Sequence, residues 1–320
     1  AKESLDFYLM KKPESYCSLD TTTRMAARAY SAAKKIDQKT DIKQLFGVAI
    51  SATLSTNYEK KGEHRFHIAV QTRDFSQSIS CILNKGQRSR EQEEELVTEF
   101  VIALISDCCG FEFRYPEIKE SVEHLKIPAQ DGWADLMSEK IEFVTSCNQQ
   151  PRLIFPGAFN PMHDGHIAMS ELAQKELNEK VFFEICIQNV DKPPLSYHQI
   201  KKTIDQFNSS QNWVLTKAGK FSDKARLFPN STFIIGADTL VRIFDERFYA
   251  SRREMMEEFQ IFNLNNNKFL VFGRENKNKF IELKDIQIPD PIKKLFRGFG
   301  ENIFRKDVSS STIRARNTEE

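Results

Sequence analysis

The sequence has few cysteines, no long apolar run and almost no net charge, and each of these features argues against a class of protein. Its six cysteines in 320 residues show no C-x-x-C spacing, so we expect free thiols, a reducing compartment and a cytoplasmic protein. No stretch approaches the ~18 to 20 consecutive apolar residues of a membrane span, so we expect no membrane partner. With 46 Lys and Arg against 45 Asp and Glu, no general electrostatic field favours a nucleic-acid partner.

Hydrophobic residues make up 40% of the chain and charged residues 28%, which is typical of folded globular domains. At about 150 residues per domain, the length predicts two of them. No fixed-period repeat is visible, which argues against solenoids and propellers. We place the boundary at the polar stretch 147–151, which ends in proline, giving domains over 1–145 and 151–320.

The amino-terminal domain mixes helical and strand patterns. An Ala-rich segment at 21–35 predicts one helix, and an acidic opening followed by helically spaced apolar residues predicts another at 88–108. Alternating apolar residues predict strands at 66–70 and 79–83. A short apolar run at 46–51 and a weak helical pattern at 136–141 complete a small α/β domain.

The carboxy-terminal domain alternates strands with helices of ten or more residues, a pattern that predicts a parallel sheet flanked by helices. Ligands of such sheets bind beyond the carboxyl ends of the strands, where the strand order reverses. The predicted strands are 153–155, 181–187, 232–235 and 269–272, and the predicted helices are 167–177, 197–207 and a region reaching 256.

The most informative segment, F-P-G-A-F-N-P-M-H-D-G-H over 155–166, leaves the first of these strands and enters a helix. Glycine allows a ligand to approach the backbone closely, and the helix start adds free N–H donors, so the segment predicts a phosphate site. His163 and His166 lie one turn apart and can face the same oxyanion. Two histidines alone leave a transition-metal shell incomplete, so we predict no protein-bound metal. The candidate phosphate-binding residues of the loop are Gly157, Ala158, Phe159 and Asn160.

A second candidate phosphate site lies near the carboxy terminus, where residues 308–314 read V-S-S-S-T-I-R. Hydroxyls and backbone N–H groups at a helix start, here from Ser310 and Ser311, can hold a polyphosphate together with Arg314 one turn further on. A serine run of this kind is, on its own, also a common helix cap.

Together these two segments resemble the nucleotidylyltransferase superfamily, whose members carry G-x-F-[DN]-P-x-H-x-G-H and, near the domain end, I-S-S-T-x-I-R. Ser311 stands where the family usually has threonine, and the hydroxyl is retained. The resemblance extends from Arg152 to the end of the chain. It implies a Rossmann-like fold, nucleotidyltransferase activity, and catalytic roles for His163, His166 and Arg314.

Within the superfamily, the run F-I-I-G-A-D-T-L at 233–240 resembles the G-A-D strand end of nicotinamide and nicotinate mononucleotide adenylyltransferases. This resemblance implies that Asp238 contacts the adenosine ribose and that Gly236 is a nucleotide-binding residue, whereas the alternative for Asp238 is a helix N-cap. The run D-K-P-P at 191–194 resembles the family's basic stretch. It implies that Lys192 contacts phosphate, with a solvated lysine as the alternative.

Three further candidates follow from the same resemblance. The family often places a tryptophan against the pyridine ring after the G-A-D segment, and the nearest candidates here are Phe248 and Tyr249. Core packing is the alternative for Phe248. Arg274 resembles the basic residue that ends the next strand, and a surface ion pair is its alternative.

The amino-terminal domain more faintly resembles the carboxy-terminal domain of the competence-damage-inducible (CinA) family, some members of which deamidate nicotinamide mononucleotide. The matching runs are F-G-V-A-I-S at 46–51 and H-I-A-V at 67–70. The Ser/Thr-Gly-Gly loop that carries the family's nucleophile has no counterpart, so we predict a non-catalytic CinA-like domain and leave open a homo-oligomer formed through it. His64 and His67 would face opposite sides of a strand, so we give them no joint role.

The resemblance implies transfer of AMP from ATP to nicotinamide or nicotinate mononucleotide, without distinguishing the two, and with Mg²⁺ held mainly by ATP oxygens. Two alternatives stay open. One is nucleotidyl transfer to another phosphorylated acceptor, such as phosphopantetheine or a choline- or glycerol-type phosphate. The other is a regulatory protein that binds nucleotides without turnover.

Overall fold

The computed structural model describes residues 2–58, 60–188, 193–276, 279–306, 308, 310 and 313–314. The predicted site residues Lys192 and Ser311 lie outside this range, as does the side chain of Phe248. The chain divides into two compact units: unit 1 is Ala1–Lys140 with Val190–Lys201, and unit 2 is Ile141–Asn189 with Lys202–Glu320.

This division differs in two places from the predicted ranges 1–145 and 151–320. Strand β5 (Phe143–Thr145) lies in unit 2, because it pairs with β8 (Asn212–Thr216), a partner that is distant in sequence. Conversely, Val190–Lys201 belongs to unit 1. Pairing and packing between distant segments decide both assignments, and neither leaves a local signal in the sequence.

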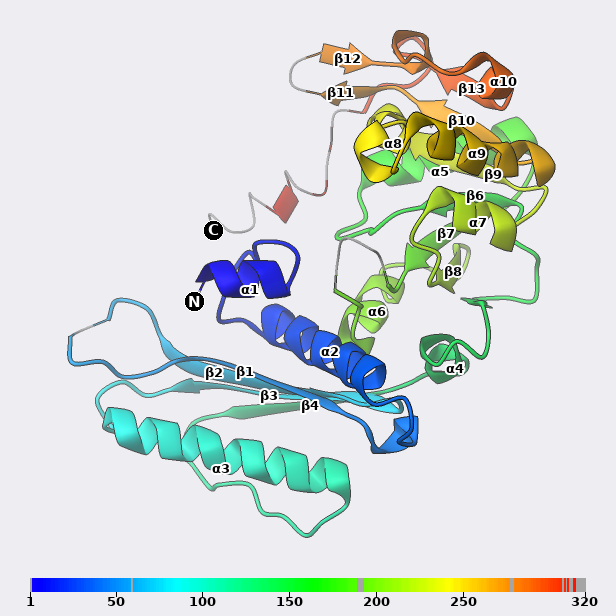
Figure 1. The fold of residues 1–320 in the computed structure, drawn as a ribbon. Coiled ribbons are helices and arrows are strands. Elements are labelled where there is room, and N and C mark those ends of the chain that lie inside the picture. The colour runs from blue at the N-terminus through cyan, green and yellow to red at the C-terminus, as the bar shows by residue number, and fades with distance from the viewer. Residues whose placement is uncertain are drawn as a thin grey trace. The chain divides into compact units, whose positions relative to one another are not determined.

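Unit 1 is built on a four-stranded antiparallel sheet in the order β1-β2-β3-β4, with α2 over one face and α3 over the other (Figure 1). The two long predicted helices and the predicted strands are confirmed, whereas α1 and β4 were not predicted. The strands are β1 (Gly47–Thr53), β2 (His64–Gln71), β3 (Phe75–Leu83) and β4 (Val122–Pro128). The helices are α1 (Lys2–Tyr8), α2 (Leu19–Ile36), η1 (Ile42–Gln44), α3 (Arg90–Cys109) and α4 (Trp133–Met137).

Helix α4 begins and ends earlier than the predicted 136–141. Gly132 adopts a φ of 80° directly before it, and Trp133 and Leu136 are buried, at 1% and 0% exposure. Ile141, which was predicted inside the helix, is 38% exposed. The helix therefore lies where Trp133 and Leu136 are buried, and the local apolar pattern did not predict this position.

Unit 2 is a seven-stranded sheet in the order β13-β10-β9-β6-β7-β8-β5, parallel except for the β5 edge, with flanking helices (Figure 1). The predicted Rossmann-like α/β class is confirmed. The remaining strands are β6 (Leu153–Pro156), β7 (Val181–Cys186), β9 (Thr232–Gly236), β10 (Lys268–Phe272), β13 (Phe296–Phe299) and the hairpin β11 (Arg274–Asn276) and β12 (Lys279–Ile281). The helices are α5 (Asp164–Leu177), α7 (Phe221–Leu227), α8 (Ala237–Ile243), η2 (Glu246–Phe248), α9 (Arg252–Leu264), η3 (Leu283–Asp285) and α10 (Asp290–Lys293). The division between the units falls inside α6 (Tyr197–Ile204), whose residues up to Lys201 belong to unit 1.

The strand order reverses at β6, because β7 lies on one side of it and β9 on the other. Ligands of such folds bind beyond the carboxyl ends of the strands at this reversal, where the loops after β6 and β9 leave the sheet. The central strands are buried on both faces, as their continuous apolar sequences indicate. Their core includes Phe182, Phe233 and Phe269, each at most 2% exposed.

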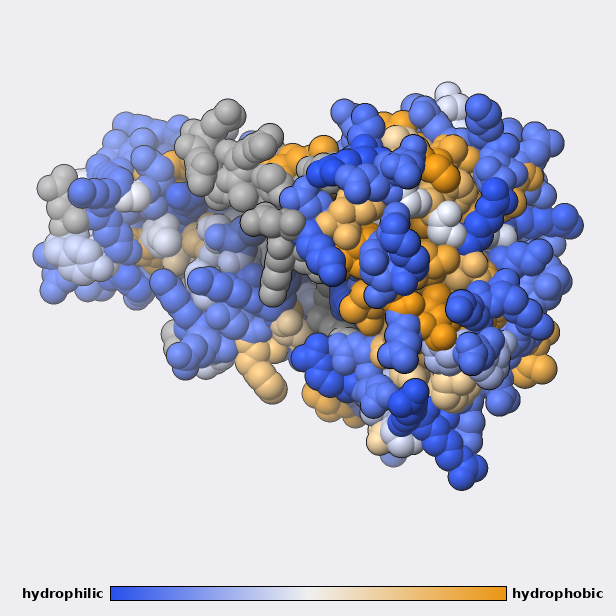
Figure 2. All heavy atoms as spheres, turned by 90° about the horizontal axis from the view of Figure 1, so that it is seen from above, coloured by the Kyte–Doolittle hydropathy of each residue, from blue (hydrophilic) through white to orange (hydrophobic). Residues whose placement is uncertain are grey.

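Polar residues cover most of the face seen in Figure 2, with hydrophobic residues visible between them. The large hydrophobic side chains that stay exposed are spread over several elements, such as Leu264 at the end of α9 and Ile303 after β13. Among the described residues, no helix combines the length and the apolar character that a membrane crossing requires.

Candidate active site

The histidine loop, residues Gly157–His163, leaves the carboxyl end of β6 at the point where the strand order reverses. The Gly157 N–H donates to the Glu184 carbonyl at 3.0 Å, which ties the start of the loop to β7. A Cβ at Gly157 would lie 2.5 Å from Cζ of Phe159, so only glycine lets the loop fold back over that ring. Ala158, between them, is exposed.

The Phe159 side chain, a predicted contributor to nucleotide binding, is 1% exposed and packs in an aromatic cluster. Its ring centroid lies 5.5 Å from that of Phe155, 5.3 Å from that of Phe183 and 5.1 Å from that of His166, all edge to face. Such contacts contribute ~0.5–1.5 kcal/mol each beyond simple burial. The ring therefore fixes the loop and supports His166, and only the backbone of Phe159 is left to face a ligand.

The two histidines of the motif lie against each other where α5 begins. Their ring centroids are 3.7 Å apart with 22° between the planes, and the backbone N–H of His163 donates to Nδ1 of His166 at 3.3 Å. With Nδ1 accepting, a neutral His166 carries its proton on Nε2 and can donate it to a ligand. A Cβ at Gly165 would meet the His163 ring at 3.0 Å, which explains the glycine between the histidines.

Both imidazoles are held in the neutral form. Burial, then the neighbouring His163 and the charge of Arg274, lowers the pKa of His166 to about 3. Burial and Arg274 also lower the pKa of His163. His163 is 9% exposed and neither of its ring nitrogens has a hydrogen-bond partner among the described residues. A buried polar group without a protein partner is a candidate contact for a ligand.

A carboxylate and a guanidinium lie at the ends of the two neighbouring strands. Asp238 follows β9 and Arg274 follows β10, and Arg274 Nη1 lies 3.8 Å from Asp238 Oδ2. Oδ1 of Asp238 is buried without a hydrogen-bond partner among the described residues. The N-cap of α8 is Gly236, so Asp238 does not serve as the cap, and its free oxygen is available to a ligand. A Cβ at Gly236 would collide with this oxygen.

The carboxy-terminal serine segment returns to the histidine loop. Ser310 Oγ donates to the Pro161 carbonyl at 2.9 Å, and Arg314 Nη1 donates to the Asn160 carbonyl. The two motifs that the sequence singled out, at opposite ends of the same unit, are therefore brought together at one loop. Among the described residues of unit 2, the predicted site residues therefore lie at the carboxyl ends of the central strands. They come from the loop after β6, from the ends of β9 and β10, and from the carboxy-terminal segment.

The model of the cytidylyltransferase-like family, part of the nucleotidylyltransferase superfamily, matches residues 154–316, about half of the chain. The chain belongs to this family. It is accordingly a nucleotidyltransferase, as its two motifs predicted. Among solved structures, a nicotinic acid mononucleotide adenylyltransferase of Plasmodium falciparum in complex with NaAD matches with 17% identity and a TM-score of 0.30, over 52% of this chain and 83% of that one. No curated protein matches the chain closely enough to count as a relative.

Two residues that anchor the loop of this cytidylyltransferase-like unit were not predicted. Gln206 accepts from the Met162 N–H through Oε1 and donates to the Phe159 carbonyl through Nε2, both at 2.9 Å. The next residue, Phe207, places its ring 5.9 Å from that of Phe159. Both follow α6, which ends at Ile204 and not at the predicted Phe207. No local pattern marks them, because their partners are distant in sequence.

Tyr249, a predicted partner of the substrate ring, is used in packing. Its hydroxyl donates to the Ile243 carbonyl at 2.8 Å, and its ring lies edge to face with Phe259 at 5.8 Å. Burial raises the pKa of its phenol to about 12. The stacking role predicted for this residue has no support in its contacts.

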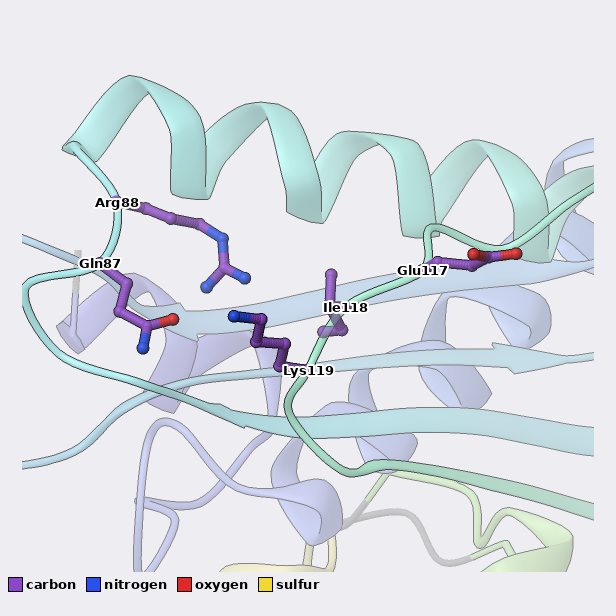
Figure 3. Close-up of a pocket in the computed structure, with 5 residues that line it drawn as sticks. All are labelled: Gln87, Arg88, Glu117, Ile118 and Lys119. Carbon is purple, nitrogen blue, oxygen red and sulfur yellow. The ribbon is translucent and has the colours of Figure 1, made fainter.

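In the described part of unit 1, the predicted histidines do not gather at one site. His64 Nδ1 lies 2.9 Å from Glu93 Oε1 and His67 Nδ1 lies 2.8 Å from Ser80 Oγ, so the two histidines have separate partners. A surface pocket of about 540 Å³ is lined by Gln87, Arg88, Glu117, Ile118 and Lys119 (Figure 3). The charge of Arg88 in this pocket is already matched by Glu120, at 2.6 Å.

All six cysteines carry free thiols. Across the part of the chain that the structure describes, no three His, Cys, Asp or Glu side chains gather as metal ligands. The donors that converge on the histidine loop are imidazole, hydroxyl and guanidinium groups, which suit a polyanion better than a cation.

Proposed function

We propose that the protein transfers AMP from ATP to the 5′-phosphate of nicotinamide or nicotinate mononucleotide, forming the dinucleotide and releasing pyrophosphate. The observation that carries the proposal is the meeting of Ser310 and Arg314 with the histidine loop. Two segments rich in phosphate-binding groups at one place favour a nucleoside triphosphate as the ligand.

The proposed reaction needs no protein nucleophile, because the acceptor phosphate is itself a nucleophile. One of its oxygens attacks the α-phosphorus of ATP, the bond from that phosphorus to the bridging oxygen breaks, and pyrophosphate leaves with that oxygen. The activation barrier has two sources. Two polyanions must be brought into line, and negative charge develops on the α-phosphate and the leaving group in the transition state.

We assign each residue a role that its position supports. His163 and His166 donate hydrogen bonds to the transferred and bridging phosphates. Their pKa values are lowered, so at physiological pH each ring is neutral and keeps one N–H group that can donate. Arg314 and the backbone of the segment around Ser310 hold the β- and γ-phosphates, since the Ser310 hydroxyl donates to the Pro161 carbonyl. The bond from Arg314 to the Asn160 carbonyl places its guanidinium at the histidine loop, and a guanidinium suits phosphate oxygens.

The proposed choice of acceptor rests on the G-A-D segment. The unpaired, buried Oδ1 of Asp238 suits a ribose hydroxyl, which can donate to it. Arg274 beside Asp238 offsets the carboxylate charge and adds positive potential near the phosphates.

We also propose Mg²⁺ as the cofactor and a cytoplasmic location. The described residues offer no carboxylate cage, so the ion would be held by ATP oxygens and water, which magnesium retains readily. When bound, it neutralises charge on the triphosphate. The location is supported by the free thiols.

The test is an assay with ATP, Mg²⁺ and each mononucleotide, following dinucleotide and pyrophosphate separately. We expect the two products in equal amounts with one of the mononucleotides. The matched arms replace ATP by CTP, and the mononucleotide by phosphopantetheine, choline phosphate or glycerol phosphate. Turnover only in those arms, or ATP binding with no turnover in any arm, would overturn the proposal.

A further inference from the structure

Three consecutive carbonyls of the histidine loop, at residues 159–161, are bound by side chains from elsewhere in the chain. In chain order, they accept from Gln206 Nε2 at 2.9 Å, from Arg314 Nη1 and from Ser310 Oγ at 2.9 Å. The loop and all three donors belong to unit 2. The acceptors of this stretch of backbone are therefore already used within one unit of the protein.

The N–H groups at the start of this stretch are not used. Those of Ala158, Phe159 and Asn160 have no hydrogen-bond partner in the part of the chain that the structure describes. Phe159 has a φ of 43°, in the left-handed region, and consecutive N–H groups around such a residue can form a concave anion-binding site. The loop thus has donors, and not acceptors, left for a ligand.

Gln206 determines the direction of the last of these donors. In a trans peptide, the carbonyl of one residue and the N–H of the next point in opposite directions. The peptide between Phe159 and Asn160 is trans, and its carbonyl is bound by Gln206. The Asn160 N–H therefore points away from Gln206.

Gln206 also binds the peptide between Pro161 and Met162, at its other end. The Met162 N–H donates to Gln206 Oε1 at 2.9 Å, and the Pro161 carbonyl accepts from Ser310. Gln206 and the carboxy-terminal segment consequently lie on opposite sides of this trans peptide. One side chain thus holds two peptide groups, and rotating either group would break a hydrogen bond.

We propose that Gln206 is a positioning residue for nucleotidyl transfer, which directs the Asn160 N–H at the transferred α-phosphate. Gln206 touches no substrate and acts through the backbone of the loop. The N–H that it directs donates to the negative charge that develops on the α-phosphate, as donors of an oxyanion hole do. This inference rests on the proposed function and deepens it, because it adds a donor to the site and names the residue that orients it.

The first experiment follows backbone amide resonances in the wild type and in Gln206→Met, which keeps most of the side-chain volume and removes both hydrogen bonds. We expect the Met162 amide to exchange with solvent about tenfold faster in the variant, because its acceptor is lost. Adding ATP and Mg²⁺ without an acceptor should shift the Asn160 amide resonance in the wild type and much less in the variant. The Gln206 side chain is exposed, so the variant should fold, and Gln206→Ala replaces it if it does not.

An Asn160 amide that does not respond to ATP in the wild type, or that responds equally in both proteins, would overturn the inference. The same holds for an unchanged exchange rate at Met162. These measurements need no turnover. A wild type whose Asn160 amide responds to ATP but which forms no dinucleotide therefore refutes the proposed function and leaves the positioning role intact.

The second experiment measures kcat and KM for ATP in Gln206→Met and Gln206→Glu. The glutamate can still accept from the Met162 N–H, but its second oxygen repels the Phe159 carbonyl and turns that peptide. A misdirected donor costs alignment in the transition state more than binding. We therefore expect kcat to fall about tenfold in Gln206→Met and about 10²-fold in Gln206→Glu, both at nearly constant KM.

Gln211→Glu is the matched control, because it adds the same charge beside the same loop. Gln211 Nε2 lies 4.0 Å from Met162 Sδ, and its Oε1 accepts from the Asn208 N–H at 3.0 Å, a bond that glutamate keeps. We expect its kcat to stay within about twofold of the wild type. Equal losses of kcat in the two glutamate variants, a change in KM alone, or an unchanged kcat in Gln206→Met would each contradict the positioning role.

Discussion

Lys224 Nζ lies 2.7 Å from Glu184 Oε1, and the two side chains are almost completely buried, at 5% and 1% exposure. The same carboxylate oxygen accepts from the Thr216 hydroxyl, and the lysine also donates to the Ala218 carbonyl. Glu184 pairs with Pro156, and its carbonyl accepts from the Gly157 N–H. The ion pair therefore lies next to the start of the histidine loop, and its polar atoms are well satisfied.

Removing the lysine alone should be strongly destabilising. In Lys224→Met the Glu184 carboxylate would stay buried without its counter-charge, and breaking such a pair costs ~3–5 kcal/mol. The double variant Lys224→Met/Glu184→Leu should recover much of this loss, because no lone charge remains. Urea unfolding measures both. The matched surface pair is Arg253 and Glu257, at 2.8 Å and mostly exposed, so Arg253→Met should unfold like the wild type. A double variant as unstable as Lys224→Met would refute this account.

His166→Ala should lower kcat by about 10²- to 10³-fold, which is the typical cost of losing one positioned donor at a developing charge. The fold should persist. Far-ultraviolet circular dichroism checks this, because it reports the helices. His124→Ala, on the exposed strand β4 of unit 1, is the matched control and should keep wild-type turnover. Wild-type turnover in His166→Ala would remove that imidazole from the mechanism.

Stability should fall as the pH drops below about 6.5, and His166 should account for part of the slope. Burial, with His163 and Arg274, holds its folded pKa at about 3, whereas an unfolded histidine titrates near ~6.5. Between these values the unfolded chain binds a proton that the folded chain does not. Stability is therefore complete above the unfolded pKa and is lost toward the folded one, at up to ~1.4 kcal/mol per pH unit for this group.

The pH prediction is checked by thermal unfolding of the wild type and of His166→Gln at several values between pH 4 and 7. The glutamine variant should show the shallower dependence, because it cannot titrate. His198, whose pKa is lowered to about 4 by burial, contributes a similar slope that both proteins share. Identical slopes in the two proteins would show that His166 is not held neutral by the fold.

The sequence marked the motif residues that meet in unit 2 better than it marked the residues that hold them in place. The H-x-G-H spacing places His163 and His166 together because one helical turn separates them, and it needs no tertiary information. The meeting of Arg314 with Asn160 was predicted only through the resemblance to a superfamily. Gln206 escaped prediction altogether, because its partners lie across the fold and it belongs to no motif.

Two strands at the edges of the sheets, β4 and β13, were also not predicted from the sequence. Strand β4 exposes four consecutive residues, 123–126, and so lacks the alternation that identified β2 and β3. Strand β13 is only four residues long and contains Gly298. A strand of this kind is stabilised by its neighbour in the sheet more than by its own pattern, and only the pairing with β10 reveals it.

Gly157→Ala should damage the site although it adds a single methyl group. The new Cβ would lie 2.5 Å from the Phe159 ring, and that ring is locked among aromatic neighbours, so we expect a loss of ~1–3 kcal/mol and at least about tenfold in kcat. Gly62→Ala, where a Cβ would meet nothing within 4 Å, is the matched control and should be neutral. Gly157→Ala/Phe159→Leu should regain part of the activity, because a smaller side chain relieves the overlap. If the alanine variant keeps full turnover, or the double variant is worse than the single one, the ring does not shape the loop.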